Sequence, residues 1–91
     1  MSYFVYVLQS QKDGRRYIGL TTNIKIRVRQ HNSGQVPSTK SRIPFQLAYR
    51  EEFQDRTSAR DREKYFKTAA GRRYLDKILY AQVAELAYAH V

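Results

Sequence analysis

The sequence predicts a small α+β domain: a three-stranded, largely antiparallel sheet with flanking helices, in the order β-β-α-β-α-α. Two observations support this prediction. The N-terminal part holds short runs rich in β-branched and aromatic residues, two of them separated by an Asp-Gly turn. The C-terminal part carries apolar residues at helical spacing. A chain of 91 residues without repeats or a linker suits a single domain, residues 1–91.

Three segments are predicted to be strands. Residues 3–9 and 16–20 are rich in valine, isoleucine and tyrosine, and the segment between them contains Asp13-Gly14, which favours a tight turn. These two strands therefore form a hairpin. Residues 45–53 alternate between apolar and polar side chains and predict the third strand.

A helix is predicted directly after the hairpin. Thr22 or Asn23 can cap its first turn, and it runs to about Asn32 or Ser33. The segment that follows, residues 34–44, is a polar and basic loop that contains both prolines.

Two further helices complete the prediction. The first begins at Asp55 or Thr57 and ends near Ala70, with Gly71 as the residue that stops it. The second runs from about Arg73 to the C-terminus and carries an apolar stripe: Leu75, Ile78, Leu79, Val83 and Leu86. The Ala- and Tyr-rich stretch 79–91 is expected to cap the core or to pair with another chain.

The charge balance indicates the class of partner. Seventeen Lys and Arg residues face eight Asp and Glu residues, which gives a formal charge of +9 and a pI near 10.1. A basic domain suits a polyanion, because each neutralised phosphate releases condensed counterions. The alternative is a solubility surface without chemistry. Nucleic acid is the expected partner.

Composition also excludes several classes of protein. The chain has no cysteine, so it has neither disulfides nor a thiolate zinc site. No apolar run approaches the length of a membrane span, and no basic leader precedes the first strand. We therefore expect a cytoplasmic protein with no membrane partner.

One carboxylate stands on the apolar stripe of the second helix. Ala59, Phe66 and Ala70 mark the stripe expected to face the sheet, and Glu63 falls on it. A carboxylate facing a core is costly unless it is paired or bound to a metal. Glu63 is therefore a candidate ligand for a divalent cation; the alternative is an edge residue paired with Arg60, Arg62 or Lys67.

The first helix brings a guanidinium and an imidazole to one face. Asn23, Arg27 and His31 are spaced four apart, so they lie above one another beside the apolar stripe. An arginine and a histidine in this position can hold a phosphate and move a proton. The alternative is a solvated face with a structural histidine.

The hairpin contributes two tyrosines and a glycine. Tyr6 and Tyr17 lie on neighbouring strands, and Gly19 follows Tyr17 on the same face. A glycine in a strand leaves room for the close approach of backbone or ligand. The alternative is that both are ordinary sheet tyrosines, because the chain has eight.

These residues resemble the motifs of the GIY-YIG nuclease family, over residues 3–75. The first motif is Phe4-Val5-Tyr6 and the second is Tyr17-Ile18-Gly19; the segment 23–31 carries the Arg and His, and 61–64 carries the Glu. The length is similar to that of small stand-alone bacterial members. The resemblance implies an endonuclease that hydrolyses phosphodiester bonds, with DNA favoured over RNA, and it suggests DNA repair or processing.

The resemblance also implies roles for individual residues. Glu63 would hold one Mg²⁺ or Mn²⁺ ion, and Arg27 would stabilise charge on the scissile phosphate. Tyr17 or Tyr6 would orient or deprotonate the attacking water, with help from His31. A metal ion lowers the pKa of bound water, which makes this chemistry feasible near neutral pH.

The nucleic-acid backbone is expected to lie along the loop of residues 35–42. Lys40 and Arg42 would contact phosphates, and Ser38 and Thr39 would add hydrogen bonds. The alternative is a connecting loop without a partner. No segment resembles a recognition helix that enters a groove, so little base specificity is expected.

Two alternatives to the active nuclease stay open. Many family members carry an Asn after the metal-binding Glu, whereas this chain has no Asn after Asn32. This difference favours a nucleic-acid-binding domain that keeps the nuclease fold with little or no turnover. An interaction module that uses the last helix is the third hypothesis.

Overall fold

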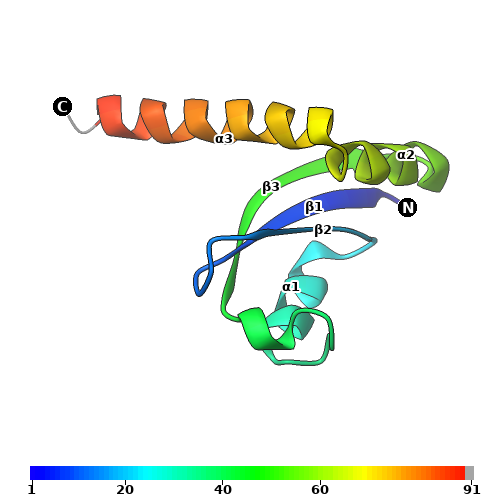
Figure 1. Cartoon of the computed structure of the whole chain (residues 1–91). Helices are drawn as coiled ribbons and strands as arrows, with labels where there is room; N and C mark the ends of the chain where they lie inside the picture. Colours follow the sequence, from blue (N-terminus) through cyan, green and yellow to red (C-terminus); the bar gives the residue numbers. More distant parts are fainter. Residues whose placement is uncertain (90–91) are drawn as a thin grey trace.

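A computed structural model describes residues 1–89, with side chains through residue 80 (Figure 1). The order of elements confirms the predicted α+β class and the sequence β-β-α-β-α-α, with one short 3₁₀ turn, η1, inside the predicted loop. The elements are β1 (Tyr3–Ser10), β2 (Arg16–Thr21), α1 (Ile24–Asn32), η1 (Lys40–Arg42), β3 (Phe45–Phe53), α2 (Arg56–Phe66) and α3 (Ala69–Ala89).

The sheet has the strand order β2-β1-β3, and both pairings are antiparallel. The hairpin turns at Gly14, whose φ of 73° is a conformation that side chains with a Cβ rarely adopt. Within the predicted hairpin, the register places Tyr6 directly opposite Gly19. The central strand is buried on both faces from Val5 to Leu8.

The sheet separates two cores, because successive side chains of β1 point to opposite faces. Val5 and Val7 pack against the helices α2 and α3, whereas Tyr6 and Leu8 pack on the side of α1. Figure 1 shows α1 on one side of the sheet and the two later helices on the other.

The first two helices begin at predicted caps. The side chain of Asn23 accepts a hydrogen bond from the Ile26 amide at the start of α1. At the start of α2, Asp55 accepts from the Ser58 amide at 2.8 Å. Both caps satisfy amides that have no partner within the helix.

The boundary between α2 and α3 differs from the prediction. The helix α2 ends at Phe66 instead of Ala70, and α3 begins at Ala69 instead of Arg73. Gly71 therefore lies inside α3, where a Cβ would stand 1.9 Å from the Tyr65 carbonyl oxygen. The glycine permits the close approach of two backbones; it does not terminate a helix. Ala70, predicted to face the sheet, is exposed.

The predicted apolar stripe of the last helix is confirmed over its first part. Leu75 is fully buried, and Ile78 and Leu79 are half-buried. The expectations for Val83 and Leu86 lie outside the described side chains. Among the described residues, no helix has the length and apolarity needed to cross a bilayer.

Candidate active site

The ring of Tyr6 lies over the backbone of Gly19 on the adjacent strand. A Cβ at Gly19 would stand 2.3 Å from the Tyr6 hydroxyl oxygen, inside van der Waals contact. Tyr6 is 1% exposed, so its ring has little room to move aside. The glycine predicted to allow a close approach therefore makes space for the Tyr6 phenol.

The Tyr6 hydroxyl contacts two side chains from α1. Its oxygen lies 3.0 Å from Nε2 of His31 and accepts a longer hydrogen bond, 3.4 Å, from Nε of Arg27. A second nitrogen of Arg27 donates to the Gln30 side chain at 3.0 Å. The face of α1 predicted to carry Arg27 and His31 thus meets the hairpin at Tyr6, whereas Asn23 serves as the cap.

His31 is fully buried, and its second ring nitrogen bonds to the loop. Nδ1 lies 2.8 Å from the Thr39 hydroxyl, which is also fully buried. That hydroxyl also lies 3.3 Å from the Val36 carbonyl, and when it donates there it accepts from His31. We infer from this arrangement that Nδ1 of His31 carries the proton and that Nε2 accepts the hydrogen bond of the Tyr6 hydroxyl.

Burial and charge adjust the pKa values of this cluster. Burial lowers the pKa of His31, and the positive charge of Arg27 lowers it further. Burial raises the pKa of Tyr6, although the hydrogen bond from Arg27 opposes the rise. The bond to Tyr6 raises the pKa of Arg27, although burial opposes it. Together these shifts favour a neutral imidazole, a protonated phenol and a guanidinium cation at neutral pH.

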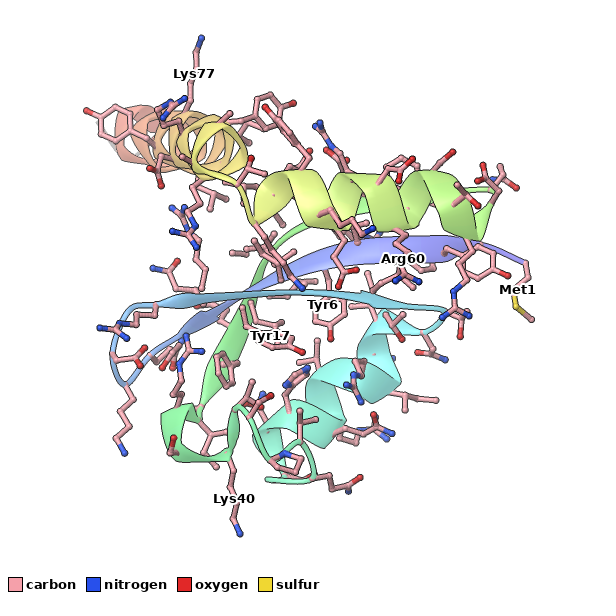
Figure 2. All side chains as sticks on the ribbon, turned by 45° about the vertical axis from the view of Figure 1, so that its right-hand side comes forward. Met1, Tyr6, Tyr17, Lys40, Arg60 and Lys77 are labelled. Carbon is pink, nitrogen blue, oxygen red and sulfur yellow. The ribbon has the colours of Figure 1, made fainter. Side chains whose placement is uncertain are left out.

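Tyr17 packs beside the cluster and is more open than Tyr6. Its ring centroid lies 4.8 Å from that of His31 and 6.3 Å from that of Tyr6. Tyr17 is half-buried, whereas Tyr6 is fully buried. Figure 2 shows both tyrosines projecting from the sheet toward α1. Tyr17 is therefore the phenol that solvent can reach.

Glu63 approaches the sheet from the opposite side. It lies on α2 between Ala59 and Phe66, which pack on the face of Val5 and Val7. Its side chain is 21% exposed and forms an ion pair with Lys67 at 3.5 Å. Burial is the main cause that raises the pKa of Tyr6, and the Glu63 charge adds to this rise although α2 packs on the other face of the sheet.

Arg62, the neighbour of Glu63, fixes the position of α2. Its guanidinium donates two hydrogen bonds to Glu51 on β3, at 2.8 and 3.1 Å. It also lies 4.6 Å from the centroid of the Phe66 ring and close to the rings of Tyr65 and Tyr74. This bidentate ion pair enclosed by aromatic rings holds the helix that presents Glu63.

The side chain of Glu63 has the chemistry needed to bind one hard divalent cation. Glu63 offers carboxylate oxygens, the ligand type that Mg²⁺ prefers, and the Lys67 ammonium beside it shows that the position accepts a positive charge. The described residues contain no group of three His, Cys, Asp or Glu side chains placed to hold a metal. A single ion would therefore depend on Glu63, water and phosphate oxygens, an arrangement common for Mg²⁺.

The loop predicted to hold the nucleic-acid backbone is organised differently. Thr39 is buried under His31, so its hydroxyl does not reach solvent. Arg42 forms an ion pair with Asp13 at 3.1 Å and donates to the Arg16 carbonyl, which ties the loop to the hairpin. Ser38 and Lys40 are exposed, and Lys40 points away from Tyr6 and Tyr17 (Figure 2).

The structure thus brings together four of the five predicted catalytic residues, namely Tyr6, Tyr17, Arg27 and His31, and sets Glu63 across the sheet from them. The sequence did not identify Thr39 as the partner of His31. No local signal marks this contact, because the loop reaches the helix only through tertiary folding.

Comparison with known proteins assigns the class. The model of the GIY-YIG catalytic domain matches residues 2–75, so the chain belongs to this family. The match contains the three strands, α1, α2 and the first turns of α3, and so covers the residues discussed above. The family has a nuclease fold, which implies nucleic acid as the partner.

Individual relatives are UPF0213 proteins of bacteria. The chain is 44% identical over 68 residues to the UPF0213 protein of Desulfotalea psychrophila, across 72% of this chain and 61% of that protein. It therefore spans about three fifths of that relative. It is 36% identical to the Staphylococcus haemolyticus protein, across 84% of this chain and 93% of that one.

A solved structure agrees with the fold. The solution NMR structure of the UPF0213 protein from Bacillus halodurans superposes with a TM-score of 0.54 at 30% identity. The superposition covers 86% of this chain and 85% of that one.

Proposed function

We propose that the protein is an endonuclease that uses one Mg²⁺ or Mn²⁺ ion to hydrolyse phosphodiester bonds of nucleic acid, with DNA favoured. The observation that supports it best is the hydrogen-bonded series Arg27–Tyr6–His31, which is buried at Tyr6 and His31 and has the more open Tyr17 beside it. Buried polar side chains are costly, and such groups gather where chemistry is done.

Arg27 is the residue proposed to bind the scissile phosphate. Its guanidinium is half-buried and remains a cation, because the hydrogen bond to Tyr6 raises its pKa. A fixed positive charge that faces a developing anion lowers the barrier without reorganisation. The two hydrogen bonds to Tyr6 and Gln30 hold the guanidinium in place.

We assign the two tyrosines different roles because they differ in solvent exposure. Tyr17, the more open phenol, is proposed to orient or deprotonate the attacking water. Tyr6 and His31 are too buried to touch water, so they are proposed to hold Arg27 and the Tyr17 ring in position. The Tyr6 hydroxyl donates to Nε2 of the neutral His31 and accepts from Arg27, which fixes its orientation.

Glu63 is proposed to hold the metal ion, and Lys67 to release its carboxylate when the ion binds. The bound ion would supply a positive charge for the phosphate oxygens and lower the pKa of the attacking water. Water and phosphate oxygens would supply its other ligands.

The test is a cleavage assay on single-stranded, nicked and branched DNA, with an RNA arm, in Mg²⁺, Mn²⁺ or EDTA. Cleavage is expected only with metal. Glu63→Gln and Arg27→Ala should each lower the rate about 100-fold or more, and Glu63→Gln should keep binding. Asp61→Asn and Arg29→Ala are matched controls, because both residues are exposed on the same helices.

The alternative hypothesis, a nucleic-acid-binding domain with little or no turnover, predicts the opposite result. It would bind nucleic acid with a steep salt dependence and release no product with either metal. Tight binding by the parent protein together with no cleavage of any substrate would replace the nuclease proposal with this alternative.

A further inference from the structure

We propose that a basic groove along the edge of β2 binds the phosphate backbone of the nucleic-acid strand next to the cleaved bond. The substrate class rests on the proposed function; the groove is a separate site that the sequence did not predict. Its volume is about 660 Å³, and the hairpin forms one wall while the end of α2 and the start of α3 form the other.

Positive charge lines this groove from both walls. Arg15 and Arg16 come from the hairpin, Lys67 directly follows α2, and Arg72 lies in the first turn of α3. Among the residues that the structure describes, Asp76 is the only carboxylate that lines it, and it pairs with Arg16 at 2.5 Å. The described lining thus holds four cationic side chains and one anionic side chain. This excess of positive charge favours a ligand with several negative charges in a row.

The two exposed arginines are free of any ion pair among the described residues. Arg15 and Arg72 both face solvent, and the salt bridges of the described chain involve other residues. Arg72 also stands in the first turn of α3, which contains no acidic residue. A cation is unfavourable beside the positive end of a helix, and a bound phosphate would offset this cost.

The groove opens onto the candidate active site. Tyr17 lines the groove and packs its ring against His31. Lys67 lines it as well and pairs with Glu63. A strand whose scissile phosphate lies between Tyr17 and Glu63 would therefore place its next phosphates against the basic walls.

The floor of the groove and its far end favour single-stranded over double-stranded nucleic acid as the ligand. The half-buried Ile18, above the buried Leu75, gives the groove an apolar floor that a sugar or base can cover. Beyond the Arg16–Asp76 pair lies a second hollow of about 690 Å³, whose lining includes Tyr80, 76% exposed. Positive walls combined with an exposed aromatic ring are typical of sites where the bases of a single strand stack.

The test measures binding in EDTA, where a metal-dependent enzyme cannot cleave. Fluorescence anisotropy with a labelled single-stranded DNA, the matching RNA and the matching duplex compares Arg15→Gln/Arg72→Gln with the parent protein. The expected result is binding of the single strands at least about tenfold weaker, with a salt slope reduced by about 1.4, since each lost phosphate contact on a single strand removes about 0.7.

The matched control is Lys25→Gln/Arg29→Gln, which removes the same charge from exposed positions on α1. Its binding should fall much less. Equal losses in the two double variants would overturn the groove in favour of general charge attraction. A loss confined to the duplex would overturn the single-strand assignment.

The outcome is separable from the proposed catalysis. A protein that fails to cleave with any metal, yet loses binding only in the groove variant, contradicts the nuclease and keeps the groove. A protein whose cleavage depends on Glu63, but whose binding is unchanged in the groove variant, contradicts the groove and keeps the nuclease. Thermal melting of each variant shows whether the fold is retained.

Discussion

The two faces of the sheet bury different kinds of side chain. On the side of α2 and α3, Val5 and Val7 meet an apolar set of Ala59, Phe66 and Leu75. On the side of α1, the fully buried set includes the phenol of Tyr6, the imidazole of His31 and the hydroxyl of Thr39. The central strand β1 contributes side chains to both faces, because successive side chains of a strand point to opposite sides of the sheet.

This difference separates a face that packs for stability from the face to which we assign the proposed chemistry. Every buried polar side-chain atom of the described residues has a hydrogen-bond partner, so the polar face avoids the cost of unmade bonds. Replacing both partners of a buried hydrogen bond by apolar groups of the same shape can be nearly neutral or stabilising. We therefore attribute the polar face to function and the apolar face, with Arg62, to holding Glu63 in place.

The largest expected effect on stability lies on the apolar face. Gly71→Ala places a Cβ 1.9 Å from the Tyr65 carbonyl oxygen and 2.6 Å from the Phe66 Cα, and backbone atoms cannot rotate away. The free energy of unfolding should fall by about 3 kcal/mol or more, measured by urea denaturation. A loss below about 1 kcal/mol would contradict the tight junction between α2 and α3.

On the polar face, the two tyrosines should respond differently. Tyr17→Phe should lower the cleavage rate about 100-fold with little change in stability, because this phenol is the open one. Tyr6→Phe should also lower stability, by about 1–3 kcal/mol, because it leaves Nε2 of the buried His31 without a donor. Full activity of Tyr17→Phe would remove Tyr17 from the mechanism.

Thr39→Val tests how the ring of His31 is held. The change keeps the shape of the side chain but removes the acceptor of the Nδ1 proton, so stability should fall by about 1–3 kcal/mol. Nitrogen NMR should show the Nδ1–H tautomer in the parent protein and in Thr39→Ser, and a changed tautomer population in Thr39→Val. An Nε2–H tautomer in the parent protein would contradict the proton assignment.

The smallest expected effect is a pH dependence of stability due to His31. Its folded pKa lies below 6.5, the ordinary value, because burial and Arg27 disfavour the charged ring. Below about pH 6.5 the unfolded chain binds a proton that the folded chain does not, so stability falls as the pH drops toward the lowered folded pKa. His31→Phe should lack this dependence of stability on pH. Urea denaturation of the parent protein and the variant between pH 5 and 7 tests this. The second histidine, His90, is present in both proteins and so does not affect the comparison.

Local signals predicted most of the fold. The Asp13-Gly14 turn, the caps at Asn23 and Asp55 and the alternation of β1 each act within a few residues, so the sequence displays them directly. The prediction that Gly71 stops a helix was wrong, because a glycine can either end a helix or allow two backbones to come close. Only the tertiary structure distinguishes these two uses.

The site was less predictable, because its parts come from distant segments. The spacing of Arg27 and His31 indicated a shared face, and the strand pattern placed Gly19 on the face of Tyr17; the pairing of Tyr6 with Gly19 appears only in the structure. The bond from His31 to Thr39 depends on the path of an irregular loop. The basic groove joins Arg15 to Arg72, which no spacing rule relates.

The central claim is that Glu63 and the cluster around Arg27 act on one bound ion and its phosphate. Paramagnetic broadening of NMR signals during a Mn²⁺ titration, with a short oligonucleotide present, tests it directly, with Glu63→Gln as the control. Broadening is predicted to centre on Glu63 and to extend across the sheet edge to Gly19 and Arg27, and to vanish in the variant. Broadening confined to other acidic residues, or unchanged in Glu63→Gln, would contradict the claim.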